Sequence, residues 1–301
     1  MILNEIKKEL RHSKNLTLTS RYIILYRGAS VVIYDYKFVC QKKILNLKYV
    51  YNGYVSPDET KLLLVSNTNR YYLISVENFS MLSTHSIKSP YNENLEGIAC
   101  WSSNDSFLLP VQNSISMLST LRKFNCDSSN SFEDFLAESF WIIYVTFVAQ
   151  KNSYLIIGLD RRKNIWNLIW MDMYGNYTIY RIDDFDEAIL HVNVCFDAEE
   201  IILTGESKFY SCDFHGVPSD MMKKYHFENI IYHGFPLFLK RSKNNASIVY
   251  LGTTNELVVY DLKHHFTINS YHMEFGARGI EELNDIIFVC SSDGIKPISL
   301  L

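Results

Sequence analysis

One stretch, residues 54–87, decides the fold: YVSPDETKLLLVSNTNRYYLISVENFSMLSTHSI. The Ser-Pro-Asp turn near its start leads into an apolar run at 61–65, and the polar residues 67–69 separate this run from the next. Short runs of aliphatic and aromatic residues, divided by turn residues, are typical of an antiparallel meander. The stretch therefore predicts one small sheet of short strands.

The same pattern recurs along the whole chain. Short apolar runs begin at residues 23, 62, 107, 154, 201, 248 and 286, which are 39, 45, 47, 47, 47 and 38 residues apart. A turn and a second run follow each of them. Another apolar segment precedes most first runs, and a more polar segment follows most second runs. A repeat of this period points to a propeller or solenoid.

A four-stranded unit of about 45 residues, with strands that grade from buried to exposed, is typical of a propeller blade. We therefore predict an all-β fold, a seven-bladed β-propeller of four-stranded antiparallel blades. Six or eight blades also fit, because the first, third and seventh units are the least regular. The units fill the sequence, which predicts a single domain over residues 1–301.

The last unit lacks an outer strand, because the sequence ends at Leu301, just after its second run. An open ring would leave strand edges unpaired. We expect the N-terminal segment, residues 2–10, to supply the missing strand and close the ring. A helix is the alternative for this segment, since Glu, Lys and Leu favour helices.

Several second runs end in an apolar or aromatic residue followed by aspartate: Tyr34-Asp35, Met171-Asp172, Cys212-Asp213 and Tyr260-Asp261. The turns at 56–58 (Ser-Pro-Asp) and 101–105 (Trp-Ser-Ser-Asn-Asp) are similar to SPDG-type turns. In these features the chain resembles the WD40-like (YVTN/TolB-like) β-propeller repeat proteins over its full length. The Gly-His pair of that family is absent, so its side-chain network is not implied.

Composition narrows the range of partners. The formal net charge of -4 gives no broad basic surface for nucleic acid or for an anionic membrane. No run approaches the roughly 18 apolar residues of a membrane span, and the N-terminus lacks the apolar segment of a secretory signal. We expect a cytoplasmic monomer with no nucleic-acid or membrane partner.

No residue is predicted to be catalytic and no cofactor is predicted. The sequence contains no GxSxG, HExxH, P-loop or GxGxxG motif. The six cysteines are far apart and are expected to be mainly buried. His264 and His265 are adjacent, so in a strand they would point to opposite faces and would not readily share a metal. Trp101 and Trp141 are expected to pack in the core.

Two charged segments are the candidate binding residues. The hairpin segment LDRRKNIW, residues 159–166, concentrates Arg161, Arg162 and Lys163 beside Trp166. The blade assignment places it on the face that carries the links between blades, with the acidic segment 133–138 and the acidic cluster Asp183, Asp184 and Asp186. These residues predict a charged, aromatic-edged binding rim; the alternative is a solvated tip balanced by nearby acids.

Two further patterns have alternatives of their own. The acidic cluster at 183–187 could instead bind Ca²⁺, but it lacks the glycine and the distal glutamate of an EF-hand loop, and we predict no metal site. The longest irregular stretch, residues 125–139, is expected to be a loop that could dock a partner, or to contain one short helix capped by Ser131.

These observations favour a non-catalytic WD40-like scaffold that binds a protein, a peptide or a ligand through one face. The alternative is a propeller enzyme, a hydrolase or lactonase or a glycan-active enzyme, with its site in the central channel. Such a site needs convergent polar groups on the inner strands. The segments predicted to form those strands are mainly apolar, with His191 among them.

Overall fold

The computed structural model describes residues 8–87, 93–95, 97–182, 185, 187–207, 209–219, 221 and 234–300, with the backbone alone at 128–131. Its elements are strands, apart from a helical turn at residues 8–11 and two short 3-10 turns, η1 (Ala149–Lys151) and η2 (Phe196–Ala198). No helix of the described residues is long and apolar enough to cross a membrane. The chain is all-β, as predicted.

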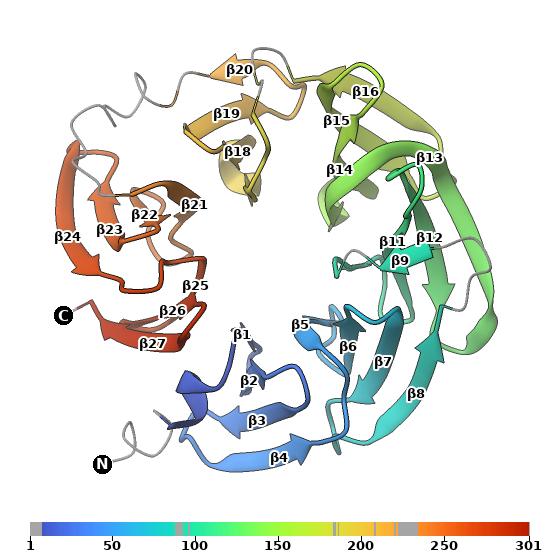
Figure 1. Cartoon of the computed structure of the whole chain (residues 1–301), viewed down its shortest axis with the longest axis horizontal. Helices are drawn as coiled ribbons and strands as arrows, with labels where there is room; N and C mark the ends of the chain where they lie inside the picture. The colour runs from blue at the N-terminus through green and yellow to red at the C-terminus, as the bar shows by residue number, and fades with distance from the viewer. Residues whose placement is uncertain are drawn as a thin grey trace. The chain divides into compact units, whose positions relative to one another are not determined.

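The described chain forms two compact units. The first unit, residues 15–181, begins with two four-stranded antiparallel sheets. Figure 1 shows the first in blue and the second in blue grading to turquoise. They are β1 (Asn15–Leu18), β2 (Tyr22–Tyr26), β3 (Val31–Asp35) and β4 (Cys40–Ile44), then β5 (Val50–Val55), β6 (Lys61–Ser66), β7 (Arg70–Ser75) and β8 (Met81–Ser86).

One eight-stranded sheet completes this unit. Its strands are β9 (Glu93–Leu95), β10 (Cys100–Trp101), β11 (Ser106–Asn113), β12 (Ser119–Asn125), β13 (Ser128–Val148), β14 (Ser153–Asp160), β15 (Ile165–Asp172) and β16 (Tyr177–Arg181). The 21-residue strand β13 pairs with β12 through its first part and with β14 through its second part. Figure 1 shows β13 as the long green ribbon. The third and fourth repeat units therefore share one sheet.

The second unit contains residues 8–14 and the chain from 182 onward. Its first two sheets have four strands and its last has three. The strands are β17 (His191–Cys195), β18 (Glu200–Thr204), β19 (Phe209–Asp213) and β20 (Pro218–Ser219); β21 (Pro236–Arg241), β22 (Ile248–Thr253), β23 (Glu256–Asp261) and β24 (Phe266–His272); and β25 (Gly279–Leu283), β26 (Ile286–Ser291) and β27 (Gly294–Ser299).

The second strand of a sheet is buried on both faces, and β6 shows why. Alternate side chains of a strand point to opposite faces. Leu62 and Leu64 pack in one cluster with residues of the first sheet, whereas Leu63 and Val65 pack in another with residues of β11. All four are no more than 1% exposed. The continuous apolar runs in the sequence are thus strands sandwiched between neighbouring sheets.

The aspartates that end four of the second runs share one structural role. Each accepts backbone N–H groups of the turn that follows: Asp35 from Lys37 and Val39, Asp172 from Tyr174 and Asn176, Asp213 from His215 and Val217, and Asp261 from Lys263 and His264. This is the Asx turn, in which a carboxylate replaces a missing backbone acceptor. The repeated aspartate therefore stabilises the turn that joins the second run of each hairpin to the outer strand.

Two sequence-based expectations are wrong, one for residues 125–139 and one for the N-terminal segment. Residues 125–139 form neither a loop nor a helix, because residues from 128 onward lie in β13. Left-handed backbone angles at Leu136 and Glu138, with a register shift opposite Thr120, mark a wide bulge there. A bulge bends a strand and changes its direction, and this lets one strand serve two repeat units. The described strands consequently form six sheets, and seven separate blades are not confirmed.

The N-terminal segment differs from the predicted strand. Residues 2–7 lie outside the described residues, whereas residues 8–10 are helical, so the strand prediction is wrong for them. Residues 8–14 contact the turn between β26 and β27. Lys14 Nζ donates a hydrogen bond to the carbonyl of Ser292 at 2.5 Å, and a Cβ at Gly294 would lie 2.5 Å from the carbonyl oxygen of Arg11. The stretch next to the N-terminus thus packs on the three-stranded sheet.

A substitution at Gly158 provides a test of the packing at β13. A Cβ on Gly158 would lie 2.9 Å from Cβ of Phe140, closer than side chains normally approach. We expect Gly158→Ala to lower the free energy of unfolding by about 1–3 kcal/mol, in the range of overpacking substitutions. Urea denaturation measures this. Gly279→Ala is the matched control, because a Cβ there meets nothing within 4 Å. Equal effects of the two substitutions would contradict the close packing at β13.

Candidate protein-binding surface

The hairpin between β14 and β15 presents three basic side chains on a well-defined turn. Asp160 Oδ1 accepts the backbone N–H groups of Arg162 and Lys163 at 3.1 and 3.2 Å. Asn164 closes the turn with a left-handed backbone angle, φ 55°. The side chains of Arg161, Arg162 and Lys163 are exposed. The backbone geometry therefore holds the three cations outward at the tip.

Two tryptophans form the base of this tip. Trp166, which the sequence pattern placed at the rim, is only 4% exposed. Its ring lies 6.2 Å from that of Trp141, which is partly exposed and comes from the middle of β13. The guanidinium carbon of Arg161 lies 5.7 Å from the Trp141 ring centroid, within the range of a cation–π contact. The aromatic residue in contact with the tip is thus Trp141, which the sequence pattern assigned to core packing.

Two of the acidic residues expected to balance the tip, Asp134 and Glu138, bind other side chains. Asp134 binds Arg122 at 2.7 Å, and Arg122 also binds Glu93 at 3.2 Å. Glu138 accepts hydrogen bonds from Asn113 at 3.0 Å and from Ser116 at 3.1 Å. The predicted site residues Asp183, Asp184 and Asp186 lie outside the described residues.

Among the described residues, the charge of the tip is largely uncompensated. Lys163 Nζ lies 3.6 Å from Asp160 Oδ2, and this is a weak, exposed pair. Within the part of the chain that the structure describes, Arg161 and Arg162 have no acidic partner. Two arginines at an exposed tip are thus free to bind an anionic group.

A neighbouring hairpin adds apolar side chains. The turn between β11 and β12 exposes Ile115 (79%) and Met117 (38%). Glu138 ties this turn to β13 through its bonds to Asn113 and Ser116, three residues before Trp141. Both hairpins therefore flank the same stretch of β13. We call this set the β13 surface: Ile115, Met117, Trp141, Arg161, Arg162 and Lys163.

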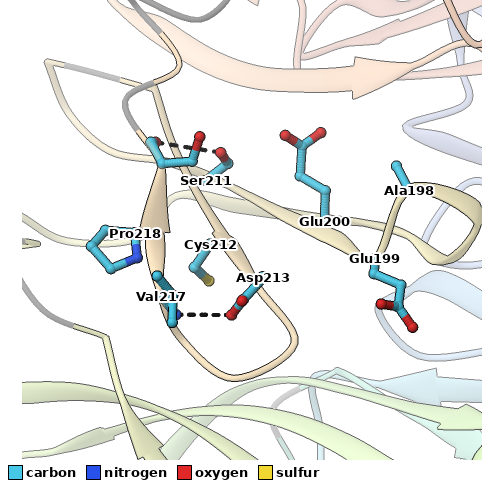
Figure 2. Close-up of a pocket in the computed structure, with 9 residues that line it drawn as sticks. Ala198, Glu199, Glu200, Ser211, Cys212, Asp213, Val217 and Pro218 are labelled. Carbon is cyan, nitrogen blue, oxygen red and sulfur yellow. Dashed lines mark hydrogen bonds between the residues drawn. The ribbon is translucent and has the colours of Figure 1, made fainter.

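A cavity of about 240 Å³ lies in the second unit, at one end of the sheet formed by β17 to β20. Figure 2 shows the side chains of Glu199 and Glu200 pointing to different sides. Glu200 is paired with Arg241, and Asp213 caps its own turn. The residues that line the cavity are Ala198, Glu199, Glu200, Ser211, Cys212, Asp213, Val217, Pro218 and Ser219.

The chemistry of this cavity does not suit an acid–base or nucleophilic mechanism. Burial raises the pKa of the Cys212 thiol to about 12, so the thiol is protonated at neutral pH and is a poor nucleophile. The carboxylates of Glu199 and Glu200 diverge, and that of Glu200 is neutralised by Arg241. A pair of carboxylates in acid and base roles must flank one reacting atom, and these do not.

The inner strands of the second unit carry polar side chains that bind to neighbouring sheets. Arg241 N donates to Asn193 Oδ1 at 3.1 Å, and Lys240 pairs with Glu281 at 3.1 Å. Glu282 accepts a hydrogen bond from Tyr250 at 2.6 Å. No group of three or more His, Cys, Asp or Glu side chains in the described ranges could hold a metal ion. The polar groups on these strands join sheet to sheet instead of converging on one point.

His191, on β17, differs from these residues, because its Nδ1 makes no hydrogen bond to a neighbouring sheet. Its Nδ1 is buried and makes no hydrogen bond, and its ring lies 5.8 Å from that of Phe238. Burial, with the nearby charge of Lys240, lowers the pKa of His191 to about 4. The imidazole is therefore neutral at physiological pH, since loss of hydration disfavours the charged form.

Comparisons with known proteins give the fold. No family model matches the sequence, and no curated protein matches it. A β-propeller domain of Cps50 (Swd1) from Myceliophteria thermophila superposes with a TM-score of 0.70 at 13% identity, covering 96% of this chain and 98% of that one. A chain of the mitotic checkpoint complex superposes with a TM-score of 0.70 at 10% identity, covering 95% and 86%. The chain is similar in fold to WD40 β-propeller domains, as its sequence pattern predicts.

The buried histidine makes stability depend on pH in a defined window. The pKa of His191 is about 4 in the folded chain and near 6.5 when unfolded, so the unfolded chain binds more protons between these values. Stability is therefore lost as the pH falls from about 6.5 to about 4, by up to about 3 kcal/mol. We expect His191→Gln to flatten this part of the profile of unfolding free energy against pH. The exposed His272 provides a control, His272→Gln; an unchanged slope in His191→Gln would refute the assignment.

Proposed function

We propose that this chain is a non-catalytic, WD40-like propeller scaffold that binds an acidic segment of a partner protein through the β13 surface. The observation that carries the proposal is the pair Arg161 and Arg162, exposed on a hydrogen-bonded turn and without an acidic partner among the described residues. Arginine offers a planar fork of donors that matches a carboxylate. The solved structures with a similar fold include a chain from a protein complex, which supports a protein as the partner.

The mixed character of the surface favours a protein segment over a small anion. Exposed ion pairs contribute only about 0.2–1 kcal/mol each, so two arginines alone give weak binding. Ile115 and Met117 add exposed apolar area on the turn between β11 and β12, and Trp141 adds an aromatic ring. Aromatic and arginine anchors carry most of the energy of many protein interfaces. An acidic segment with one or two apolar side chains uses both kinds of contact.

A peptide-binding experiment tests the proposal, first with the wild-type protein and then with charge-reversal variants. The probe is a library of fluorescent decapeptides rich in Asp and Glu with one or two apolar residues, each matched with its Asn and Gln counterpart. We expect acidic members to bind better than their amide counterparts. Binding should weaken as salt rises, because salt screens exposed charges.

The double variant Arg161→Glu/Arg162→Glu should lose at least about tenfold in affinity, since like charges then face the peptide. The matched control is Lys42→Glu/Lys43→Glu, which reverses two exposed cations on the outer strand β4. This control should bind as wild type. Equal binding of acidic and amide peptides, or equal losses in the two double variants, would sink the proposal.

We also propose that residues 1–301 form one monomeric, cytoplasmic domain, a seven-bladed ring closed at its last blade by the N-terminal segment. Support comes from the three-stranded last sheet and from the packing of residues 8–14 on its turn. Small-angle scattering tests this. A single compact domain of this length has a radius of gyration of about 19 Å, and the scattering mass should be that of one 35.1 kDa chain. A clearly larger radius, with two separated maxima in the distance distribution, would contradict one closed domain.

A further inference from the structure

The indole N–H of Trp141 suggests a more specific contact, one that rests on the proposed function. We infer that this N–H donates a hydrogen bond to a backbone carbonyl of the bound acidic segment. In the free chain Arg161 contacts the Trp141 ring. In the complex a carboxylate of the segment draws Arg161 away from the ring and opens the donor. Trp141 is then a recognition residue, and Arg161 is a movable cover.

The first support is the state of the donor itself. Three side-chain atoms of the described chain are buried without a hydrogen-bond partner, and Trp141 Nε1 is the one that belongs to the β13 surface. By contrast, Trp101 Nε1 donates to the carbonyl of Tyr54 at 2.9 Å. A buried donor without an acceptor has lost its hydrogen bonds to water and gained none in return. A ligand that supplies an acceptor restores a hydrogen bond to it.

The second support is that the fold leaves Trp141 little freedom. Phe140, the residue before it, fills the space above Gly158, where no Cβ fits. Trp141 pairs with Leu159, and a register shift follows between Ile142 and Tyr144. The ring lies beside the buried Trp166, 6.2 Å from its centroid. The unpaired donor is a consequence of the path of β13.

The third support is that Arg161 is held weakly. Its cation–π contact with the Trp141 ring is long, 5.7 Å, and such contacts are weak at exposed sites. The one acidic side chain in the turn, Asp160, accepts the backbone N–H groups of Arg162 and Lys163 and pairs with Lys163. A carboxylate offers the guanidinium two parallel charge-assisted hydrogen bonds, which the ring cannot accept. An acidic segment can thus move Arg161 where a neutral one cannot.

These three features define the chemistry of the occupant. It is an extended segment, because an extended backbone offers carbonyl groups to the indole. It carries a carboxylate for Arg161 or Arg162 and an apolar side chain for Ile115 and Met117. A folded acidic patch would offer the charge without an accessible carbonyl, so its binding would not depend on the indole N–H.

The experiment compares two tryptophan variants with the strongest-binding peptide of the acidic library. Trp141→Phe keeps an aromatic ring and removes the N–H, and we expect the affinity to fall about five- to tenfold, the effect of one hydrogen bond. Trp170→Phe is the matched control, because Trp170 lies toward the other end of β15, opposite Leu155 and Thr178, and it should bind as wild type. Wild-type protein with ¹⁵N-labelled tryptophan provides a second readout. Of its four indole N–H signals, the one that Trp141→Phe removes should move downfield on addition of peptide.

The outcomes separate the two proposals. If acidic peptides bind and depend on Arg161 and Arg162, but Trp141→Phe binds as wild type and no indole signal moves, the role of Trp141 is wrong and the proposed function stands. If wild-type protein binds no acidic peptide, the proposed function itself is wrong. Should Trp141→Phe fold poorly, the indole signals of the wild-type protein still decide.

Discussion

The structure depends on the burial of a sheet's second strand between two neighbouring sheets, as in β6. In β6, Leu62 and Leu64 face one neighbour and Leu63 faces the other, and none is exposed. Burying each such side chain contributes about 1.5–3 kcal/mol. A sheet with one face open to water would leave half of this free energy unrealised. Each repeat unit is therefore stable only beside another, which is why the pattern recurs along the chain.

The same constraint explains where function can lie. Side chains within the sheets are used for packing, or for bonds between sheets such as Lys240 with Glu281. Groups free to bind a partner are left at the turns and at the links. The long strand β13 brings two turns to one link, because it passes without a break from β12 to β14. The β13 surface is thus a product of an irregularity in the repeat.

Much of this could be predicted from sequence. Strands buried on both faces read as continuous apolar runs. The aspartates at the ends of second runs supported the WD40-like resemblance, and the structure adds that such an aspartate, for example Asp172, accepts the backbone N–H groups of a turn. The course of β13 could not be predicted, because residues 125–139 are polar and look like a loop. Its strand pairing comes from β12, and its bulge at Leu136 and Glu138 from tertiary packing. The basic residues of the tip were predicted as candidates, but their contact with Trp141 depends on β13 and carried no local signal.

The central claim is that an acidic segment binds at the β13 surface, and hydrogen–deuterium exchange with a bound acidic peptide tests it most directly. Exchange of backbone amides slows where a ligand covers or stabilises them. The account predicts slower exchange in three segments that are distant in sequence: 113–119, 138–142 and 159–166. All other described segments should exchange as in the free chain. Protection confined to other segments, such as the hairpin of β22 and β23, would contradict the account.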